Sequence, residues 1–472
     1  MSRQSPDFTR FWEEFEVVFD PEKPVEQPRL FAERERKYSA VASIVRGLRP
    51  EAKTRSKYLL TGTQGNGKTS ELIHCAAELA KTRIVVRVDI WDHLTLTVGE
   101  PAALERLEPW ELVSVVGTAI FRAGTELGQN WTKPETKAVE KALAELHSDG
   151  SQNPPKVDLV TLARGIAVAV GGIAGAFIGG PSGTALGSLV GEQTVKTATS
   201  LVTTAADATS WTLPIGQSRR RSSDQDPKVQ ALLSAVNRLI MSLHETLKRP
   251  LVLILDGLDR LRDEERVSAL FVRSDLLSRL ICDAIVTAPM LAMRVEAPLI
   301  SNFKHKDLGN IPVVDRDAPE RLRPHITFFT DLARRRINLI RETLDAEGIA
   351  CPDDPLPKAQ LDRLAYLSGG VVRDFVRLVR LASSEALDTG AEQISKEHIE
   401  PAIRELRLRY EWMINADEIA VLRRVMDDPS RRLPGGELAR SLLRQKRLLP
   451  YPNDSTWYYP HPLLTLGVLR PG

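Results

Sequence analysis

The residues with the clearest chemical potential lie in a glycine-rich stretch near the N-terminal end. Its spacing matches the pattern G-x-x-x-x-G-K-S/T, with Gly62, Gly67, Lys68 and Thr69 at the fixed positions. Glycines let successive backbone N–H groups turn inward around a phosphate without Cβ clashes. At this spacing the lysine reaches the β- and γ-phosphates, and the Thr69 hydroxyl binds Mg²⁺. The stretch predicts a nucleoside triphosphate site, and we expect ATP with Mg²⁺.

The residues around this loop supply the elements that the motif requires. Residues 58–60 are apolar and predict a short strand, and residues 70–80 follow a helical pattern. The start of that helix places the positive end of its dipole beneath an anion. A chance match in a glycine-rich loop would lack such flanks. We expect the nucleotide to contact Gly62, Thr63, Gln64, Gly65, Asn66, Gly67, Lys68, Thr69 and Ser70.

A second motif, near the middle of the chain, ends in acidic residues. Residues 251–255 are continuously apolar, which predicts a central parallel strand covered on both faces. Asp256 then emerges at the carboxyl edge of the sheet, where ligands bind. We expect it to be the Walker B carboxylate that holds Mg²⁺ through water. The alternative is a strand that simply ends in an Asp-Gly turn. Further strands are predicted at 83–89, 283–289 and 311–314.

The acidic motif, read as four apolar residues followed by D-G-x-D, resembles the signal-transducing ATPases with numerous domains. This STAND group belongs to the AAA+ assemblage of P-loop ATPases, and the resemblance covers most of residues 51–472. Standard AAA+ enzymes place a glutamate directly after the aspartate, whereas Gly257 stands there in this chain. The resemblance implies that Asp259 orients or deprotonates the attacking water. Capping of the next helix is the alternative role. Because Gly257 replaces the glutamate of standard AAA+ enzymes, we expect slow hydrolysis, which suits a switch.

A helical region from Pro319 onward resembles the AAA+ lid. Its Gly369-Gly370 turn, followed by an arginine early in the next helix, resembles the sensor-2 region. The resemblance implies that Arg373 is a catalytic and nucleotide-binding residue that contacts the γ-phosphate and reports it to the lid. The alternative is a surface arginine paired with a neighbouring acid.

Other positions remain less defined. Thr287 is the candidate polar sensor, although a threonine in a strand is usually structural. Arg273 and Arg294 are candidates for an arginine that acts on a neighbouring subunit's site, and the sequence does not choose between them.

The C-terminal segment, residues 416–472, shows two short helical patterns followed by a turn-containing β-like end. This order resembles the winged-helix modules that follow the lid in STAND proteins and in origin-recognition ATPases. The resemblance leaves two roles open: contact with DNA phosphates, or packing on the nucleotide domain that holds it closed. Acidic residues interleave with the basic ones, so DNA is not favoured. The arginines in question are Arg431, Arg432, Arg440, Arg444 and Arg447.

Residues 165–191 contain no charged side chain, and glycines recur there every four residues from Gly171 to Gly191. Such spacing places small residues on one helix face, so that another helix can approach closely. The Gly-Gly-Pro break at 179–181 favours a helical hairpin. Two readings stay open: a soluble self-association element, or a segment that contacts a membrane.

The composition indicates an ordinary globular protein. The chain has 472 residues, 42% hydrophobic and 27% charged, enough for two to four domains. Its net charge of +2 does not announce a nucleic-acid binder. Three scattered cysteines exclude a disulfide framework and a cysteine metal site, and the first residues carry no secretion signal. We expect a cytoplasmic location, with membrane association depending on the glycine-rich segment.

These observations predict an α/β fold: a P-loop NTPase parallel sheet with an inserted glycine-zipper helical hairpin, then a helical lid and a small winged-helix domain. The expected function is that of a slow ATPase, a nucleotide-dependent conformational switch that forms homo-oligomers when activated. The resemblance adds bacterial signalling or antiviral defence as a role. The alternative is an AAA+ ATPase that loads onto duplex DNA. The predicted boundaries are 1–50 (N-terminal helical, proline-rich segment), 51–320 (core), 157–210 (zipper insertion), 321–410 (lid) and 411–472 (winged helix).

Overall fold

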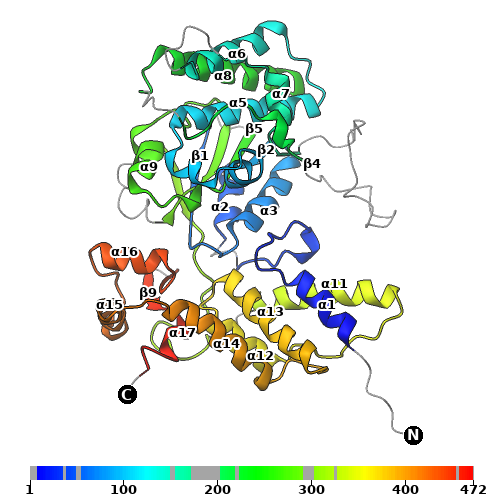
Figure 1. The fold of residues 1–472 in the computed structure, drawn as a ribbon, viewed down its shortest axis with the longest axis vertical. Helices are drawn as coiled ribbons and strands as arrows, with labels where there is room; N and C mark the ends of the chain where they lie inside the picture. Colours follow the sequence, from blue (N-terminus) through cyan, green and yellow to red (C-terminus); the bar gives the residue numbers. More distant parts are fainter. Residues whose placement is uncertain are drawn as a thin grey trace. The chain divides into compact units, whose positions relative to one another are not determined.

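The computed structural model describes residues 8–35, 39–48, 55–148, 155–171, 202–217, 223–290, 302–323, 327–452 and 456–470. These residues form two compact units. The sheet unit comprises Ala40–Thr61 and Cys75–Asp307, and the helical unit comprises Met1–Ser39, Gly62–His74 and Leu308–Gly472. The chain therefore passes between the units several times (Figure 1).

The sheet unit is built on a mixed seven-stranded sheet in the order β4-β3-β2-β5-β6-β1-β7. The five strands from β2 to β7 in this order are parallel, and β3 and β4 extend the sheet as an antiparallel pair. Continuous β-branched and leucine runs form the central strands because both of their faces are buried. The strands are β1 (Lys57–Thr61), β2 (Ile84–Asp89), β3 (Val168–Gly171), β4 (Val202–Thr204), β5 (Leu251–Asp256), β6 (Asp283–Thr287) and β7 (Lys304–Asp307).

Helices pack on this sheet around one apolar core that runs from Leu59 to Phe303. Sequence features set their starts: Thr132 forms a capping box with Glu135, and Pro227 occupies the first turn after the cap Asp226. The helices are α2 (Ala40–Gly47), α4 (Ile90–Asp92), α5 (Pro109–Glu126), α6 (Lys133–Leu146), α7 (Leu159–Arg164), α8 (Pro227–Leu247) and α9 (Glu264–Ser268). The predicted α/β class with a parallel sheet is confirmed.

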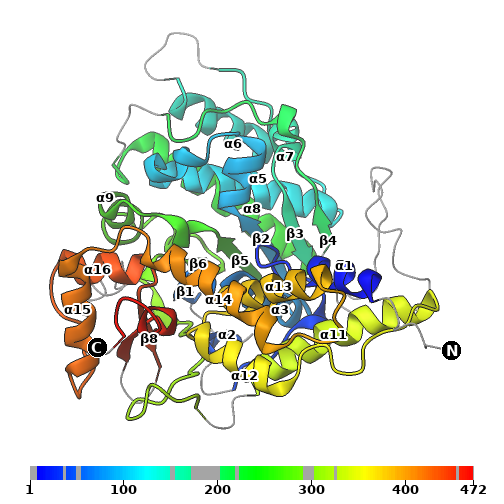
Figure 2. The same cartoon turned by 60° about the horizontal axis from the view of Figure 1, so that its bottom comes forward.

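The helical unit packs α1 (Thr9–Val18) against α11 and α13, with Phe11, Trp12 and Phe15 fully buried (Figures 1 and 2). The Trp12 indole N–H donates to the carbonyl oxygen of Ala391, 2.8 Å away. The lid region is helical, as expected. Its helices are α11 (Phe328–Ala346), α12 (Lys358–Leu367), α13 (Val372–Asp388) and α14 (Lys396–Glu411).

The C-terminal module follows in the predicted order of helix, helix and hairpin. Strands β8 and β9 pair antiparallel, with Leu448 opposite Pro460. We call this set the winged module: α15 (Ala416–Asp427), α16 (Glu437–Arg444), β8 (Leu448–Tyr451), β9 (Trp457–Pro460) and the short helix α17 (Pro462–Thr465).

Three sequence predictions were wrong in detail. The helical hairpin expected from residue 165 does not begin there: Val168–Gly171 form strand β3, since the alternating Val-Ala-Val pattern pairs with β2. Residues 172–201, the rest of the zipper, lie outside the described residues. The last core strand is β7, not 311–314, where Pro312 lacks a ladder N–H. The pattern of residues 33–48 predicts a helix that leads to the first strand, whereas α2 begins only at Ala40.

Within the described ranges, no helix is both long enough and apolar enough to cross a membrane.

Candidate functional site

The loop that follows β1 has a backbone that glycine adopts readily and other residues rarely do. Gly65 has φ +88° and Gly67 has φ +91°. A Cβ placed on Gly65 would lie 3.0 Å from the Cβ of Arg373. The Lys68 Nζ donates to the carbonyl oxygens of Gly62 (2.9 Å) and Thr63 (3.1 Å) at the start of α3 (Lys68–Ala80). The loop therefore closes on its own lysine, and its phosphate-binding role stays a prediction.

Two buried polar atoms of this loop are available for a ligand. Among the described residues, no hydrogen-bond partner is found for the Thr63 hydroxyl or for the Asn66 Oδ1. Thr69 lies half-buried in the first turn of α3, and Gln64 is exposed. Ser70 is engaged elsewhere, because its hydroxyl accepts the backbone N–H of Val25 at 3.0 Å. A hydroxyl and glycine N–H groups at a helix start fit the oxygens of a phosphate chain.

A buried ion pair braces the loop from the N-terminal segment. The Arg34 Nε lies 2.8 Å from the Glu71 carboxylate, and both side chains are almost fully buried. The same guanidinium donates to the carbonyl oxygens of Asn66 and Gly309. Burial raises the pKa of Glu71, and Arg34 opposes that rise. The sequence pattern does not reveal this ion pair, because Arg34 and Glu71 lie far apart in the sequence and only the folded chain brings them together.

In the sheet unit, two neighbouring parallel strands end in aspartates that face each other across the ladder. Asp89, the last residue of β2, is the register partner of Asp256, the last residue of β5. Asp256 is buried, and its Oδ1 accepts the N–H of Gly257 at 2.8 Å. Burial, followed by the nearby charge of Asp92, raises the pKa of Asp89. The apolar run 251–255 ends in Asp256, and the β-branched stretch 83–89, which contains Arg83 and Arg87, ends in Asp89.

Gly257 has φ +83°, and a Cβ there would lie 2.6 Å from the Asp89 Oδ1. A glutamate directly after Asp256 is therefore sterically disfavoured in this chain. Asp259 lies in the one-turn 3₁₀ helix Leu258–Arg260. The next helix, α9, is capped by Asp263, whose carboxylate accepts the Glu265 N–H at 3.0 Å, so the capping role expected as the alternative for Asp259 belongs to another residue.

The remaining polar candidates have defined surroundings. The Thr287 hydroxyl accepts the Leu258 N–H at 3.2 Å, so it ties the end of β6 to the turn after Asp256. Arg273 forms an ion pair with Glu265 at 2.8 Å. Arg294 lies outside the described residues.

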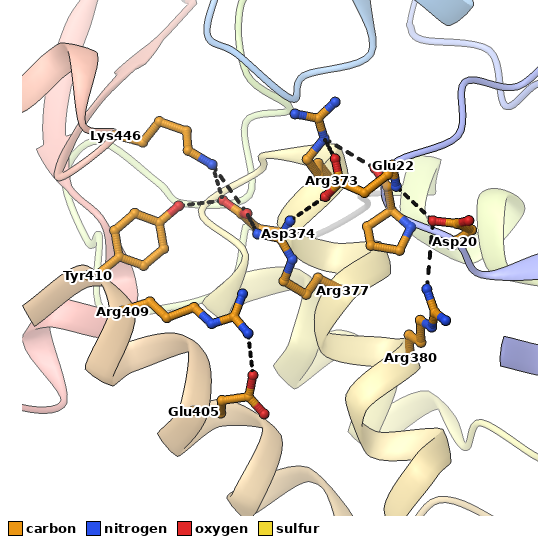
Figure 3. A network of polar contacts seen from close by, with 11 residues as sticks. Asp20, Glu22, Arg373, Asp374, Arg377, Arg380, Glu405, Arg409, Tyr410 and Lys446 are labelled. Carbon is orange, nitrogen blue, oxygen red and sulfur yellow. Dashed lines mark hydrogen bonds and ion pairs between the residues drawn. The ribbon is translucent and has the colours of Figure 1, made fainter. Parts of the chain in front are cut away.

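Arg373, in the first turn of α13, lies at the phosphate loop through its backbone. Its N–H donates to the Gly65 carbonyl oxygen at 2.8 Å. Its side chain turns toward the N-terminal segment, where Nε donates to the Pro21 carbonyl oxygen at 3.1 Å and lies 3.9 Å from the Glu22 carboxylate (Figure 3). The side chain therefore pairs with an acid, as the second reading of this residue expects, and the γ-phosphate contact stays a prediction.

Most arginines of the winged module that were considered for DNA contact bind acids or carbonyl groups of the chain. Arg440 and Arg444 both pair with Glu437. Arg447 forms a buried pair with Glu418 at 2.9 Å, and the Arg431 Nε donates to the Arg316 carbonyl oxygen at 2.8 Å.

In the described part of the chain, no three His, Cys, Asp or Glu side chains are arranged to hold a metal ion by themselves. Magnesium commonly takes one or two carboxylates and completes its shell with water and phosphate oxygens. Asp256 of the sheet unit offers a carboxylate of this kind, and Thr69 of the helical unit offers a hydroxyl.

No protein-family model matches the sequence. No curated protein matches it either. Among solved structures, the ORC1 protein of Aeropyrum pernix in complex with DNA is 12% identical, with a TM-score of 0.38 and coverage of 94% of this chain and 93% of that chain. CDC6P from Pyrobaculum aerophilum is 12% identical, with a TM-score of 0.38 and coverage of 96% of both chains. The Drosophila ORC bound to DNA is 9% identical, with a TM-score of 0.39 and coverage of 98% of this chain and 92% of that one. Likenesses this weak carry no functional argument.

Proposed function

We propose that this chain is an AAA+-like P-loop ATPase that binds ATP with Mg²⁺. The loop 62–69 holds the phosphates, Lys68 neutralises their charge, and Thr69 and Asp256 hold the metal. The main observation behind this proposal is the positive φ of Gly65 and Gly67 in the loop, which begins directly after strand β1 of the parallel sheet. Strands β1 and β5 are parallel with β6 between them, so β1 and the acid-ended β5 finish at one edge of the sheet.

The bound metal would supply charge neutralisation between the β- and γ-phosphates. The chain's own residues do the rest: the loop orients the phosphates, and Asp259 orients the attacking water. The backbone N–H of Arg373 donates a hydrogen bond to the Gly65 carbonyl oxygen, which holds this residue beside the loop. Because the glutamate of standard AAA+ enzymes is replaced by Gly257, we propose that hydrolysis is slow.

The direct experiment measures binding of a fluorescent ATP analogue, with and without Mg²⁺. We expect Lys68→Ala to weaken binding at least a hundredfold. Lys81→Ala is the matched control, because Lys81 directly follows the same helix, is exposed, and forms a local ion pair with Glu78. Equal affinity in Lys68→Ala and Lys81→Ala would refute the assignment.

We further propose that the ATPase works as a switch that assembles into homo-oligomers, with the lid (321–410) and the winged module reading the nucleotide. A defence or signalling role rests on the STAND resemblance alone. Light scattering during size-exclusion chromatography, with ADP or a non-hydrolysable ATP analogue, tests assembly. Repeating it on a variant lacking residues 157–210, and fractionating cells that express each form, tests whether the insertion mediates self-association or membrane contact.

The order of helices and hairpin in the winged module favours one alternative, an ATPase that loads onto duplex DNA. The internal pairing of Arg440, Arg444 and Arg447 weighs against it. Gel shifts across a salt series decide: tight duplex binding that weakens steeply with salt supports the alternative.

A further inference from the structure

Two adjacent residues at the start of α13 make contacts in different directions. Arg373 binds the phosphate loop through its N–H and the N-terminal segment through its side chain. Asp374 instead faces α14 and the winged module, as Figure 3 shows. A single helical turn thus touches both the loop and the module, all within the helical unit.

The Asp374 carboxylate is fully buried and collects contacts from several elements. The Tyr410 hydroxyl of α14 donates to it at 2.6 Å. From the winged module, the Lys446 Nζ lies 3.1 Å away and the His461 Nε2 lies 3.7 Å away. Arg377, one turn along α13, lies 3.7 Å away. Asp374 is therefore the charged centre that the module's cation binds.

The groups around Asp374 stabilise the charged form of its carboxyl group. Burial alone would raise the pKa of this carboxyl, but Lys446, His461 and Tyr410 together lower it well below its usual range. Lys446 also has φ +58°, a left-handed backbone conformation that residues other than glycine adopt at a cost in conformational energy. Removing one partner of a buried pair leaves the other charge uncompensated.

The turn preceding α13 is also bound to the module. The Tyr451 hydroxyl of β8 donates to the Gly369 carbonyl oxygen at 2.8 Å. The Gly370 carbonyl oxygen accepts the Ile311 N–H at 3.0 Å. The segment from Gly369 to Asp374 is thus held by the module at both ends, with the Gly65 contact of Arg373 between them.

We propose that Asp374 is a positioning residue that fixes Arg373 at the phosphate loop and makes the winged module respond to the nucleotide. This inference rests on the nucleotide site proposed above. A nucleotide that orders the loop around Gly65 then alters the Lys446 and His461 contacts through one helical turn. Loss of the Asp374 charge uncouples the winged module from the loop around Gly65. Nucleotide then still binds, but the module no longer responds to it.

The chain offers a matched control for the loss of a buried pair. Glu418 and Arg447 form an ion pair in the same module, both nearly buried, and Arg447 is the immediate neighbour of Lys446. Glu418→Gln therefore removes a comparable acid without touching α13. Asp374→Asn is nearly isosteric and removes only the negative charge. Lys446→Met removes the positive charge that faces it, and Lys446→Arg retains that charge.

The experiment combines nucleotide affinity with hydrogen exchange of the full-length chain, using ADP and a non-hydrolysable ATP analogue at saturating concentrations. In the unmodified chain we expect nucleotide to slow exchange at least threefold in residues 62–70 and also in 446–452 and 456–464. In Asp374→Asn and Lys446→Met we expect affinity to fall about tenfold, with protection of 62–70 kept and that of the module lost. Glu418→Gln and Lys446→Arg should keep both.

Two results overturn the inference: protection of the module that survives in Asp374→Asn, or loss of that protection to the same degree in Glu418→Gln. Protection confined to residues 62–70 in the unmodified chain also overturns it, while leaving the nucleotide site intact. No nucleotide binding by the unmodified chain refutes the proposed function itself, and the inference with it.

Discussion

Gly257 and Asp89 approach each other so closely that no side chain fits at position 257. A Cβ there would lie 2.6 Å from the Asp89 Oδ1 and 2.7 Å from the Trp91 nitrogen, on a backbone with φ +83°. The absence of a glutamate after Asp256 thus has a local steric cause. Asp89, at the end of β2, and the nearby Trp91 occupy the space that a side chain at position 257 would need.

This crowding predicts that Gly257→Ala destabilises the chain by about 2 kcal/mol, and that Gly257→Glu does not speed hydrolysis. Gly99→Ala is the control, because Gly99 also has a positive φ of +74° but nothing lies within 4 Å of its added Cβ. Urea unfolding of both alanine variants separates backbone strain from crowding. Equal losses would show that crowding at position 257 costs nothing.

The register pairing of Asp89 with Asp256 predicts different roles for the two acids. Asp256→Asn should keep ATP binding within a few fold and lose Mg²⁺-dependent hydrolysis, because the metal ligand is gone. Asp89→Asn removes a neighbouring negative charge worth about 1 kcal/mol, so the Mg²⁺ concentration for half-maximal hydrolysis should rise about fivefold. Magnesium titrations of phosphate release measure both effects. An unchanged Mg²⁺ requirement in Asp89→Asn would remove Asp89 from the site.

His93 predicts an acid-sensitive stability. It is buried edge-on against Trp211, with ring centroids 4.4 Å apart, and no partner for either ring nitrogen is found among the described residues. Burial lowers the pKa of His93 to about 4. The unfolded chain binds a proton near pH 6.5 and the folded chain only near pH 4, so stability is full above pH 6.5 and is lost as the pH falls.

The free energy of unfolding should therefore decrease by up to about 3 kcal/mol between pH 7 and pH 4 because of this one residue. His93→Phe should flatten that part of the profile. Denaturant unfolding at several pH values measures the difference between the two proteins. A difference that stays constant with pH would show that His93 does not titrate in this range.

Sequence periodicity was sufficient for the elements that are locally determined. The apolar run 251–255 became β5, and the helical pattern of residues 70–80 became part of α3. It failed where long-range pairing decides. Residues Val168–Gly171 are small and apolar in either a helix or a strand, and their pairing with β2 selects the strand. The charged strand Lys304–Asp307 was missed because its order comes from the ladder with β1 rather than from burial.

The same limit applies to the candidate site. Loop residues such as Lys68 are contiguous, so their spacing alone predicts them. Arg34 and Asp374 act through partners far away in the chain, Glu71 and Lys446, and such pairs become visible only in the folded structure.

Arg122 of α5 joins the two ends of the glycine-rich insertion. One guanidinium nitrogen donates to the carbonyl oxygens of Ala163 (3.1 Å), Arg164 (3.0 Å) and Ile166, near the start of the insertion, and the other donates to that of Ala205 (2.9 Å), near its end. Removing this side chain takes a donor from the partly buried carbonyl groups of Ala163 and Ile166 and from the exposed carbonyl group of Ala205. We expect Arg122→Met to cost about 2 kcal/mol, chiefly as local opening.

Hydrogen exchange should therefore become at least tenfold faster in residues 163–168 and 203–207 of Arg122→Met, with little change in β1 or β6. Lys137→Met, on the exposed face of α6, is the control for loss of a cation in the sheet unit. Arg122→Lys should give a partial effect, because one ammonium cannot span carbonyl groups on both sides of the stem. Uniform acceleration across the whole sheet would instead mean that Arg122 stabilises the unit as a whole, and the stem of the insertion would not be a separate opening element.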